Sequence, residues 1–181
     1  MKKNLFFVSV VKTVFTLATV LMMSTVFASC SKDDEPQYDG IVTIDGVEKP
    51  ILNAEYAYDG QSNFTFFLYL SADGKERVRL GLNKALHMGG GSIKLTEYEY
   101  EHKGSYWGIT YYRENKIFFD AFGSPKKITG VFNEGSLFFL DGSYTADGET
   151  SIGLDKGRVM GVDKKEHQIS IKYNGKIPKV K

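Results

Sequence analysis

The sequence is poor in the residues on which covalent cross-links and metal sites depend. It has one cysteine and three histidines among 181 residues, so it can form no internal disulfide and no cysteine-based metal cluster. The histidines, His87, His102 and His167, are scattered and show no metal-ligand spacing. We therefore expect neither a metal nor another cofactor, and a fold that is stabilised by packing.

Catalytic motifs are also missing. The chain has no nucleophile elbow, no phosphate-binding loop and no dinucleotide fingerprint. One row of carboxylates, Glu97, Glu99 and Glu101, would on a strand have the spacing that suits an inverting glycoside hydrolase. A solvated strand face explains the same row without catalysis. We predict that the protein is not an enzyme, with glycoside hydrolysis as the one enzymatic alternative.

The first 29 residues have the layout of a secretory signal peptide. A positively charged start at 1–4 precedes an apolar run at 5–27, and the small residues Ala28 and Ser29 follow. The run is nearly long enough for a transmembrane helix, which needs about 20 apolar residues. Lys12 argues against that alternative, because a lysine inside a span costs about 2.5–3.5 kcal/mol.

The only cysteine comes directly after these small residues, and the segment 26–30 (VFASC) resembles the lipobox of bacterial lipoproteins. Phe27 departs from that pattern, in which Leu or Val is usual. The resemblance implies cleavage before Cys30, a diacylglyceryl group on its thiol and acylation of the new N-terminus. Two or three acyl chains anchor a protein stably, whereas one chain binds a membrane only marginally.

An acidic run follows the cysteine at 31–35 (SKDDE). It resembles the export tag of surface lipoproteins from Bacteroides-type bacteria, and the alternative is a solvated charged linker. Together with the lipobox, it implies a protein that is lipid-anchored in the outer membrane and faces the outside of the cell. The remaining chain also resembles small uncharacterised lipoproteins of these bacteria, a likeness that implies no activity.

These motifs divide the chain into a signal peptide (1–29), a lipidated cysteine with an acidic linker (30–38) and a single domain (39–181). The signal peptide holds three lysines and no acid, so the mature chain has 20 basic and 22 acidic side chains, a net charge of −2. This balance gives no attraction to nucleic acid. The expected partners are the membrane and either a glycan or another envelope protein.

Turn and strand signals dominate the domain. Asp-Gly pairs recur at 45–46, 59–60 and 73–74, and Asp-Gly between apolar runs is a strong hairpin signal. Segments 76–82 and 168–173 alternate apolar and polar residues, whereas 63–71 is apolar on both faces and is predicted to be a central strand. Residues 82–88 can form one helical turn. The prediction is an all-β fold of nine or ten strands, an antiparallel meander that forms a β-sandwich or a flattened β-barrel.

One stretch breaks the alternation. Ile93 and Leu95 share parity with the three glutamates that follow, so a continuous strand would place aliphatic and charged side chains on one face. A β-bulge near Thr96 would correct the phase. The alternative is a strand whose far half extends into solvent.

Aromatic residues are concentrated between 98 and 122. Such rings can stack on the apolar face of a sugar, and they also build cores. The candidate ligand-binding residues are Tyr98, Tyr100, Tyr106, Trp107, Tyr111 and Tyr112. The residues expected in the core are Phe118, Phe119 and Phe122.

The signal peptide and lipobox, the density of aromatic residues and the absence of catalytic motifs together favour a lipid-anchored binding module of the cell envelope. Its ligand would be a glycan or another extracellular molecule. One alternative is a protein-interaction, structural or inhibitor-like surface lipoprotein without a small-molecule ligand. Another is a hollow barrel that carries an apolar ligand.

Overall fold

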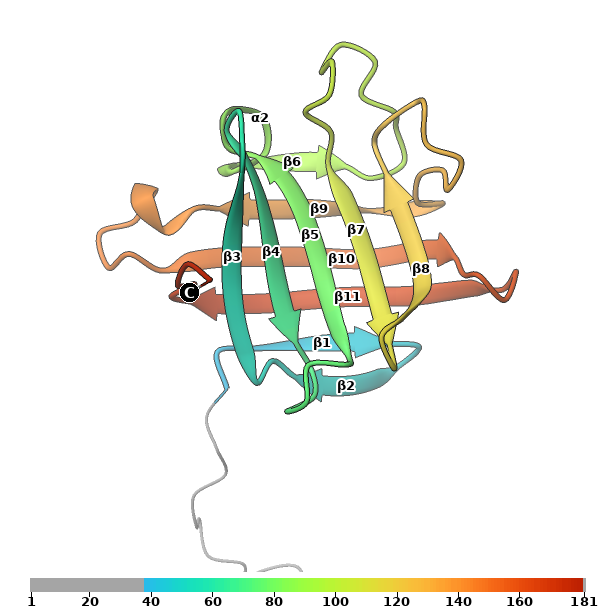
Figure 1. The fold of residues 1–181 in the computed structure, drawn as a ribbon, viewed down its shortest axis with the longest axis horizontal. Helices are drawn as coiled ribbons and strands as arrows, with labels where there is room; N and C mark the ends of the chain where they lie inside the picture. The colour runs from blue at the N-terminus through green and yellow to red at the C-terminus, as the bar shows by residue number, and fades with distance from the viewer. Residues whose placement is uncertain (1–37, 181) are drawn as a thin grey trace, which may run out of the picture. The chain divides into compact units, whose positions relative to one another are not determined.

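The computed structural model describes residues 38–180, which form two antiparallel β-sheets packed face to face (Figure 1). One sheet has six strands in the order β2-β1-β11-β10-β9-β6, and the other has five in the order β3-β4-β5-β7-β8. Within these residues the two sheets do not close into one, so the fold is a β-sandwich rather than a flattened barrel. The predicted all-β fold is confirmed. The signal peptide, Cys30 and the acidic run 31–35 lie outside the described residues.

The described residues contain eleven strands, slightly more than predicted. The six-stranded sheet consists of β1 (Gly40–Ile44), β2 (Val47–Pro50), β6 (Gly89–Lys94), β9 (Glu134–Leu140), β10 (Thr150–Met160) and β11 (Glu166–Gly175). The five-stranded sheet consists of β3 (Asn53–Gly60), β4 (Asn63–Tyr69), β5 (Arg77–Asn83), β7 (Gly108–Arg113) and β8 (Lys116–Phe122). Two short helices complete the fold, α2 (Lys84–His87) and η1 (Gly142–Tyr144).

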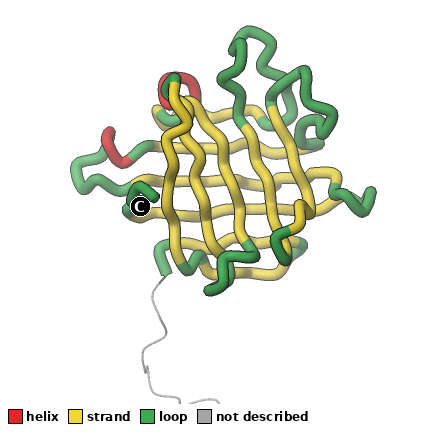
Figure 2. The backbone as a smooth tube through the Cα atoms, in the orientation of Figure 1, coloured by secondary structure: helices red, strands yellow, loops and turns green. Residues whose placement is uncertain are grey.

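The chain forms a meander in which three pairings join strands that are not consecutive in the sequence, β1 with β11, β5 with β7 and β6 with β9. Hairpins join most consecutive strands, but after β5 the chain crosses from the five-stranded sheet to the other sheet, where β6 pairs with β9 at the edge. Strands of the front sheet run across those of the rear sheet in Figure 1, the arrangement of orthogonally packed sheets. Figure 2 shows that the loops gather around the ends of the strands and leave the outer face of the five-stranded sheet open.

The core lies between the sheets and follows the alternation of the sequence. Val78, Leu80 and Leu82 of β5 are 0, 0 and 2% exposed, and the inward residues of β11 are buried as well. Phe66 of β4 and Phe139 of β9 meet across the interface with their ring centroids 4.6 Å apart. Full burial of such a side chain contributes about 1.5–3 kcal/mol. Because side chains from both sheets meet here, the interior does not support the hypothesis of a hollow carrier.

Two of the three predicted Asp-Gly turns connect strands as expected. Asp45 and Gly46 join β1 to β2 with φ angles of 50° and 81°, values that a tight hairpin turn requires. The pair at 73–74 lies in the connection from β4 to β5. The pair at 59–60 is still part of β3, and the turn is formed instead by Gln61 and Ser62, with φ of 51° and 62°. That predicted turn position was therefore wrong by two residues.

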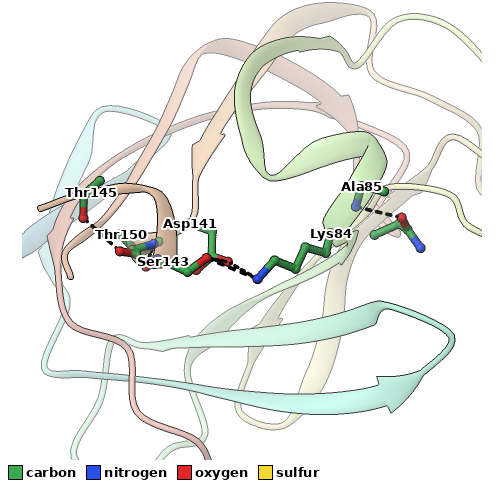
Figure 3. Close-up of polar contacts among 8 residues, drawn as sticks. Lys84, Ala85, Asp141, Ser143, Thr145 and Thr150 are labelled. Carbon is green, nitrogen blue, oxygen red and sulfur yellow. Dashed lines mark hydrogen bonds and ion pairs between the residues drawn. The ribbon is translucent and has the colours of Figure 1, made fainter.

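The predicted helical turn at 82–88 is confirmed as α2. The Asn83 side chain caps it by accepting the Ala85 N–H at 3.1 Å, and such a cap satisfies a backbone donor that the helix leaves free. Lys84 then reaches Asp141, which follows β9, with Nζ 3.0 Å from Oδ2 (Figure 3). This contact fastens α2 to the loop that contains η1.

The predicted bulge near Thr96 is absent because strand β6 ends at Lys94. Leu95 is fully buried, and the chain then leaves the sheet in a long loop, 95–107, that contains no strand. The glutamates of the predicted row are therefore on a loop. Glu97 and Glu101 are exposed, and Glu99 is half-buried.

Candidate ligand-binding face

The six aromatic residues predicted to bind a ligand are distributed over three places. Trp107 and Tyr111 lie in the core and are 0 and 1% exposed. Trp107 packs against Phe132, and Tyr111 lies on the inner face of β7 opposite Phe119. Neither ring can reach a ligand at the surface, so the prediction was wrong for these two residues. Their burial contributes to stability instead.

Tyr98 and Tyr100 lie in the 95–107 loop, beside a hollow of about 540 Å³ that α2 and β6 also line. Their ring centroids are 6.0 Å apart, and Tyr100 is 72% exposed. Both remain available to a partner. Their position is on a loop rather than on a sheet.

Glu99 lies between two histidines in the same region. Its Oε1 is 2.9 Å from His87 Nε2 and 3.1 Å from His102 Nδ1. Its Oε2 accepts the backbone N–H of Trp107 at 2.9 Å, and its own N–H donates to the carbonyl of Gly123 at 2.7 Å. Burial raises the pKa of Glu99, but the hydrogen bonds from His87 and Trp107 outweigh burial and hold that pKa below its usual value.

The three side chains, His87, Glu99 and His102, place one ligand atom each within 4.8 Å of one another, as metal ligands would. The tautomer of His87 argues against a metal. Its Nδ1 accepts the Asn83 N–H at 2.9 Å, so the proton of the neutral ring is on Nε2 and is donated to Glu99. A neutral histidine that binds a metal through Nε2 carries its proton on Nδ1, where it would oppose the Asn83 N–H. Glu99 is therefore a tether for the 95–107 loop through its hydrogen bonds with His87 and the Trp107 N–H, whereas His102 Nδ1 lies within ion-pair distance but forms no hydrogen bond to any described residue.

The outer face of the five-stranded sheet gathers further aromatic and cationic side chains, and we call it the aromatic face. No other described element lies over it in Figure 1. Strand register places Phe67 beside Arg79 and Tyr69 beside Arg77, and Arg77 is in turn beside Tyr112. The half-buried residues that define the aromatic face are Phe67, Tyr69, Arg77, Arg79, Tyr112 and Phe122.

Sequence reasoning found only part of this face. Tyr112 was a candidate and lies on it, and Tyr106 lines a hollow at its edge. Phe122 was expected in the core, but it is half-buried on the outer face. Phe118 and Phe119 do belong to the core or pack against it. The signal for the rest was the apolar character of both faces of 63–71, which places Phe67 and Tyr69 outside.

Hydrogen bonds and ring contacts hold the polar groups of the aromatic face in position. Arg77 lies over the Tyr112 ring, 4.4 Å from its centroid, and donates to Asn115 Oδ1 at 2.8 Å. The Tyr69 hydroxyl donates to Glu55 Oε1 at 2.6 Å. Burial and this hydrogen bond raise the pKa of Tyr69 to about 12. The face is thus a preorganised platform, which lowers the cost of ordering side chains on binding.

Comparisons of the chain with protein-family models, curated proteins and solved structures found no match. Within residues 38–180, no helix is long and apolar enough to cross a bilayer.

Proposed function

We propose that this protein is a lipid-anchored binding module of the bacterial cell envelope and that its ligand is a glycan. The observation that carries the proposal is the aromatic face, on which rings and arginines alternate across neighbouring strands. Tyrosine and phenylalanine rings offer flat apolar surfaces for a pyranose. Guanidinium and carboxylate groups supply donors and acceptors for its hydroxyls.

We propose binding rather than catalysis because the predicted carboxylate row is not assembled as an acid–base pair. Glu99 accepts hydrogen bonds with both of its oxygens. Glu97 is exposed, and its contact is an ion pair with Lys94 at 3.1 Å. Inverting glycosidases need one carboxyl group free to act as the acid and a second free to act as the base. All three glutamates line one hollow, but Glu99 and Glu97 are engaged in these contacts.

The proposed location rests on the sequence of the leader. The lipobox-like segment 26–30 and the acidic run after it support an anchor on Cys30 and display at the cell surface. Metabolic labelling with radioactive palmitate tests the anchor directly. The wild-type chain should incorporate the label and sediment with membranes, and Cys30→Ala should do neither. Equal membrane binding of both chains would contradict the proposal.

A retention assay tests the glycan ligand. The full chain, purified in detergent, is run on native gels that contain individual polysaccharides, and retardation by at least one of them is expected. Replacing Tyr69 and Tyr112 together by alanine should weaken retardation at least tenfold. Phe138→Ala is the matched control, because this ring is 39% exposed on the outer face of the other sheet. Retardation by no polysaccharide would refute the glycan proposal.

A second candidate function is binding to another envelope protein. It is supported by two exposed apolar side chains on neighbouring loops, Tyr100 at 72% and Ile128 at 102% exposure. Both loops project from the same end of the sandwich in Figure 1. Crosslinking in intact cells from a photoreactive residue at position 128 separates the two candidates, because a protein partner would be captured there and a glycan ligand would leave that position free.

A further inference from the structure

Two glycines face each other on neighbouring strands of the aromatic face. Gly81 of β5 is the register partner of Gly108 of β7, and both lie within strands of the five-stranded sheet. They form the floor of a hollow of about 310 Å³, the lower end of the range of about 300–1,000 Å³ for small-molecule sites. Glycine weakens a strand interior and often marks a place where a ligand approaches the backbone.

Packing explains one of these glycines and not the other. A Cβ atom at Gly108 would lie 2.4 Å from Phe122 Cε1, so glycine is needed there for the ring to lie across the strand. A Cβ atom at Gly81 would meet nothing closer than the Gly108 backbone at 4.0 Å. Gly81 also has no left-handed φ. Neither backbone conformation nor a neighbouring side chain requires glycine at this position, and its effect is to keep the space above it open.

The walls of this hollow combine aromatic rings with hydrogen-bonding groups. Phe122 and Tyr106 line one side. On the other side, Arg79 Nη2 donates to Thr65 Oγ1 at 3.2 Å, and the Thr65 hydroxyl donates to Asp59 Oδ2 at 2.6 Å. A ligand in the hollow would therefore meet a ring surface, a guanidinium and a carboxylate at once.

The charges around the hollow are balanced. Arg79 and Lys127 are the cations, and Lys127 Nζ lies 4.5 Å from the centroid of the Phe122 ring. Asp59 lines the hollow, and Asp120 lies beside it in the row of Arg79 and accepts from Thr110 at 2.7 Å. Among the described residues, Arg79 forms no ion pair. A carboxylated or sulfated sugar would bring its charge close to Asp59, whereas neutral hydroxyls can use donors and acceptors together.

We propose that the hollow above Gly81 binds one neutral pyranose unit of a glycan, with its apolar face toward the side that Tyr106 and Phe122 line and its hydroxyls between Asp59 and Arg79. This inference rests on the proposed glycan-binding function and assigns it a subsite and a ligand class. The glycan chain would continue from this hollow across the aromatic face toward Phe67 and Tyr112.

Gly81→Val tests the subsite, since a valine would occupy the floor of the hollow while its Cβ meets no clash. The variant should melt no lower than the wild type, because valine favours strands. Gly153→Val is the matched control, since it lies on the outer face of the other sheet, where a Cβ would be 3.8 Å from Phe138 Cβ. The probes are laminarin, galactomannan and xylan as neutral polysaccharides, and polygalacturonate and chondroitin sulfate as acidic ones, all with the full chain in detergent.

The expected result is that at least one neutral probe binds, that Gly81→Val weakens this binding at least tenfold and that Gly153→Val leaves it unchanged. If both valine variants bind the neutral probe like the wild type, the subsite is wrong but the glycan-binding function stands. Preference for an acidic probe would overturn the ligand class alone. Binding of none of the five probes would overturn this inference together with the proposed function.

Discussion

His167 and Asp45 are 122 positions apart in the sequence, yet His167 Nδ1 lies 2.8 Å from Asp45 Oδ2. The other ring nitrogen, Nε2, lies 3.0 Å from Asp163 Oδ1. Two carboxylates can both accept only if both ring nitrogens donate, so the structure is that of an imidazolium. The ring is 8% exposed and rests on Phe118, with centroids 4.5 Å apart. It joins the β1–β2 turn to the β10–β11 turn.

The pKa shifts of His167, Asp45 and Asp163 determine the pH range in which these three residues stabilise the fold. Burial lowers the pKa of His167, but the hydrogen bonds to Asp163 and Asp45 outweigh burial and raise that pKa above its usual value. For Asp45, burial raises the pKa, but hydrogen bonds from the Gln168 N–H and from His167 outweigh burial and bring that pKa below its usual value. For Asp163, the hydrogen bond from His167 is the main cause of a lowered pKa.

The first prediction is a pH-dependent loss of stability in His167→Gln. The contribution of a raised histidine pKa is fully present below the unfolded value of about 6.5 and disappears as the pH rises through the folded-state pKa. The lowered aspartate pKa values contribute above about 3.9 and are lost as the pH falls further. The variant should therefore lose about 1.5–3 kcal/mol at pH 5.5, the worth of hydrogen bonds to a charged group, and much less at pH 9. Urea unfolding followed by the fluorescence of Trp107, the only tryptophan, measures this. An equal loss at both pH values would show that the ring acts through packing alone.

The second prediction isolates one carboxylate without disturbing the turn. Asp45 has a φ of 50° in a two-residue hairpin turn, and Asn-Gly is as well suited to that turn as Asp-Gly. Asp45→Asn should therefore fold normally while the pKa of His167 decreases, since a neutral amide replaces an anion. A histidine NMR titration reads this pKa directly. Asp73→Asn, in another Asp-Gly turn, serves as the control and should leave the titration unchanged; a pKa that stays the same in Asp45→Asn would refute the argument.

The third prediction concerns Glu99 as the tether of the 95–107 loop. Glu99→Ala removes the acceptor for His87 Nε2 and for the Trp107 N–H, and each buried donor left unpaired costs about 1–3 kcal/mol. Glu99→Gln keeps one oxygen and should cost less. Glu97→Ala is the control, because its ion pair with Lys94 is exposed, and surface changes of this kind stay within about 0.5 kcal/mol. Chemical unfolding compares the three variants, and a Glu99→Ala chain as stable as Glu97→Ala would show that the loop is held by other contacts.

The sequence predicted those parts of the fold that depend on period and turn chemistry. Alternation in β5 and β11 identified the buried residues, because the side-chain period of a strand is two. For two adjacent aromatic residues on a strand the period does not identify the buried one, because one ring must face inward and the sequence does not say which. For Tyr111 the answer comes from its register with Val78 of β5, and register is a long-range property.

The aromatic face and the Glu99 tether could not be predicted from the sequence, and the physical reason is the same for both. The sequence shows that segment 63–71, which contains Phe67 and Tyr69, is apolar on both faces. Only the strand order shows that no described element covers the face on which these two rings lie. The contact between His87 and Glu99 depends on a loop that folds back on α2. No residue spacing in the sequence predicts such a contact.

The last prediction separates the two glycines of the aromatic face by stability alone. In Gly108→Ala the new methyl group would lie 2.4 Å from Phe122 Cε1, so the ring must move, and such overpacking costs about 1–3 kcal/mol. In Gly81→Ala the methyl group meets no clash, and loss of glycine flexibility in the unfolded chain should add about 0.4–1 kcal/mol of stability.

A double-mutant cycle with Phe122→Ala checks the cause. With the ring removed, Gly108→Ala should lose most of its penalty, because the two changes act on one contact. Gly81→Ala should have the same effect with and without the Phe122 ring, since a Cβ at that position is not in contact with the ring. If Gly108→Ala remained equally destabilising without the ring, the need for glycine at 108 would lie in the backbone, and the ring would not depend on that glycine for its position on the aromatic face.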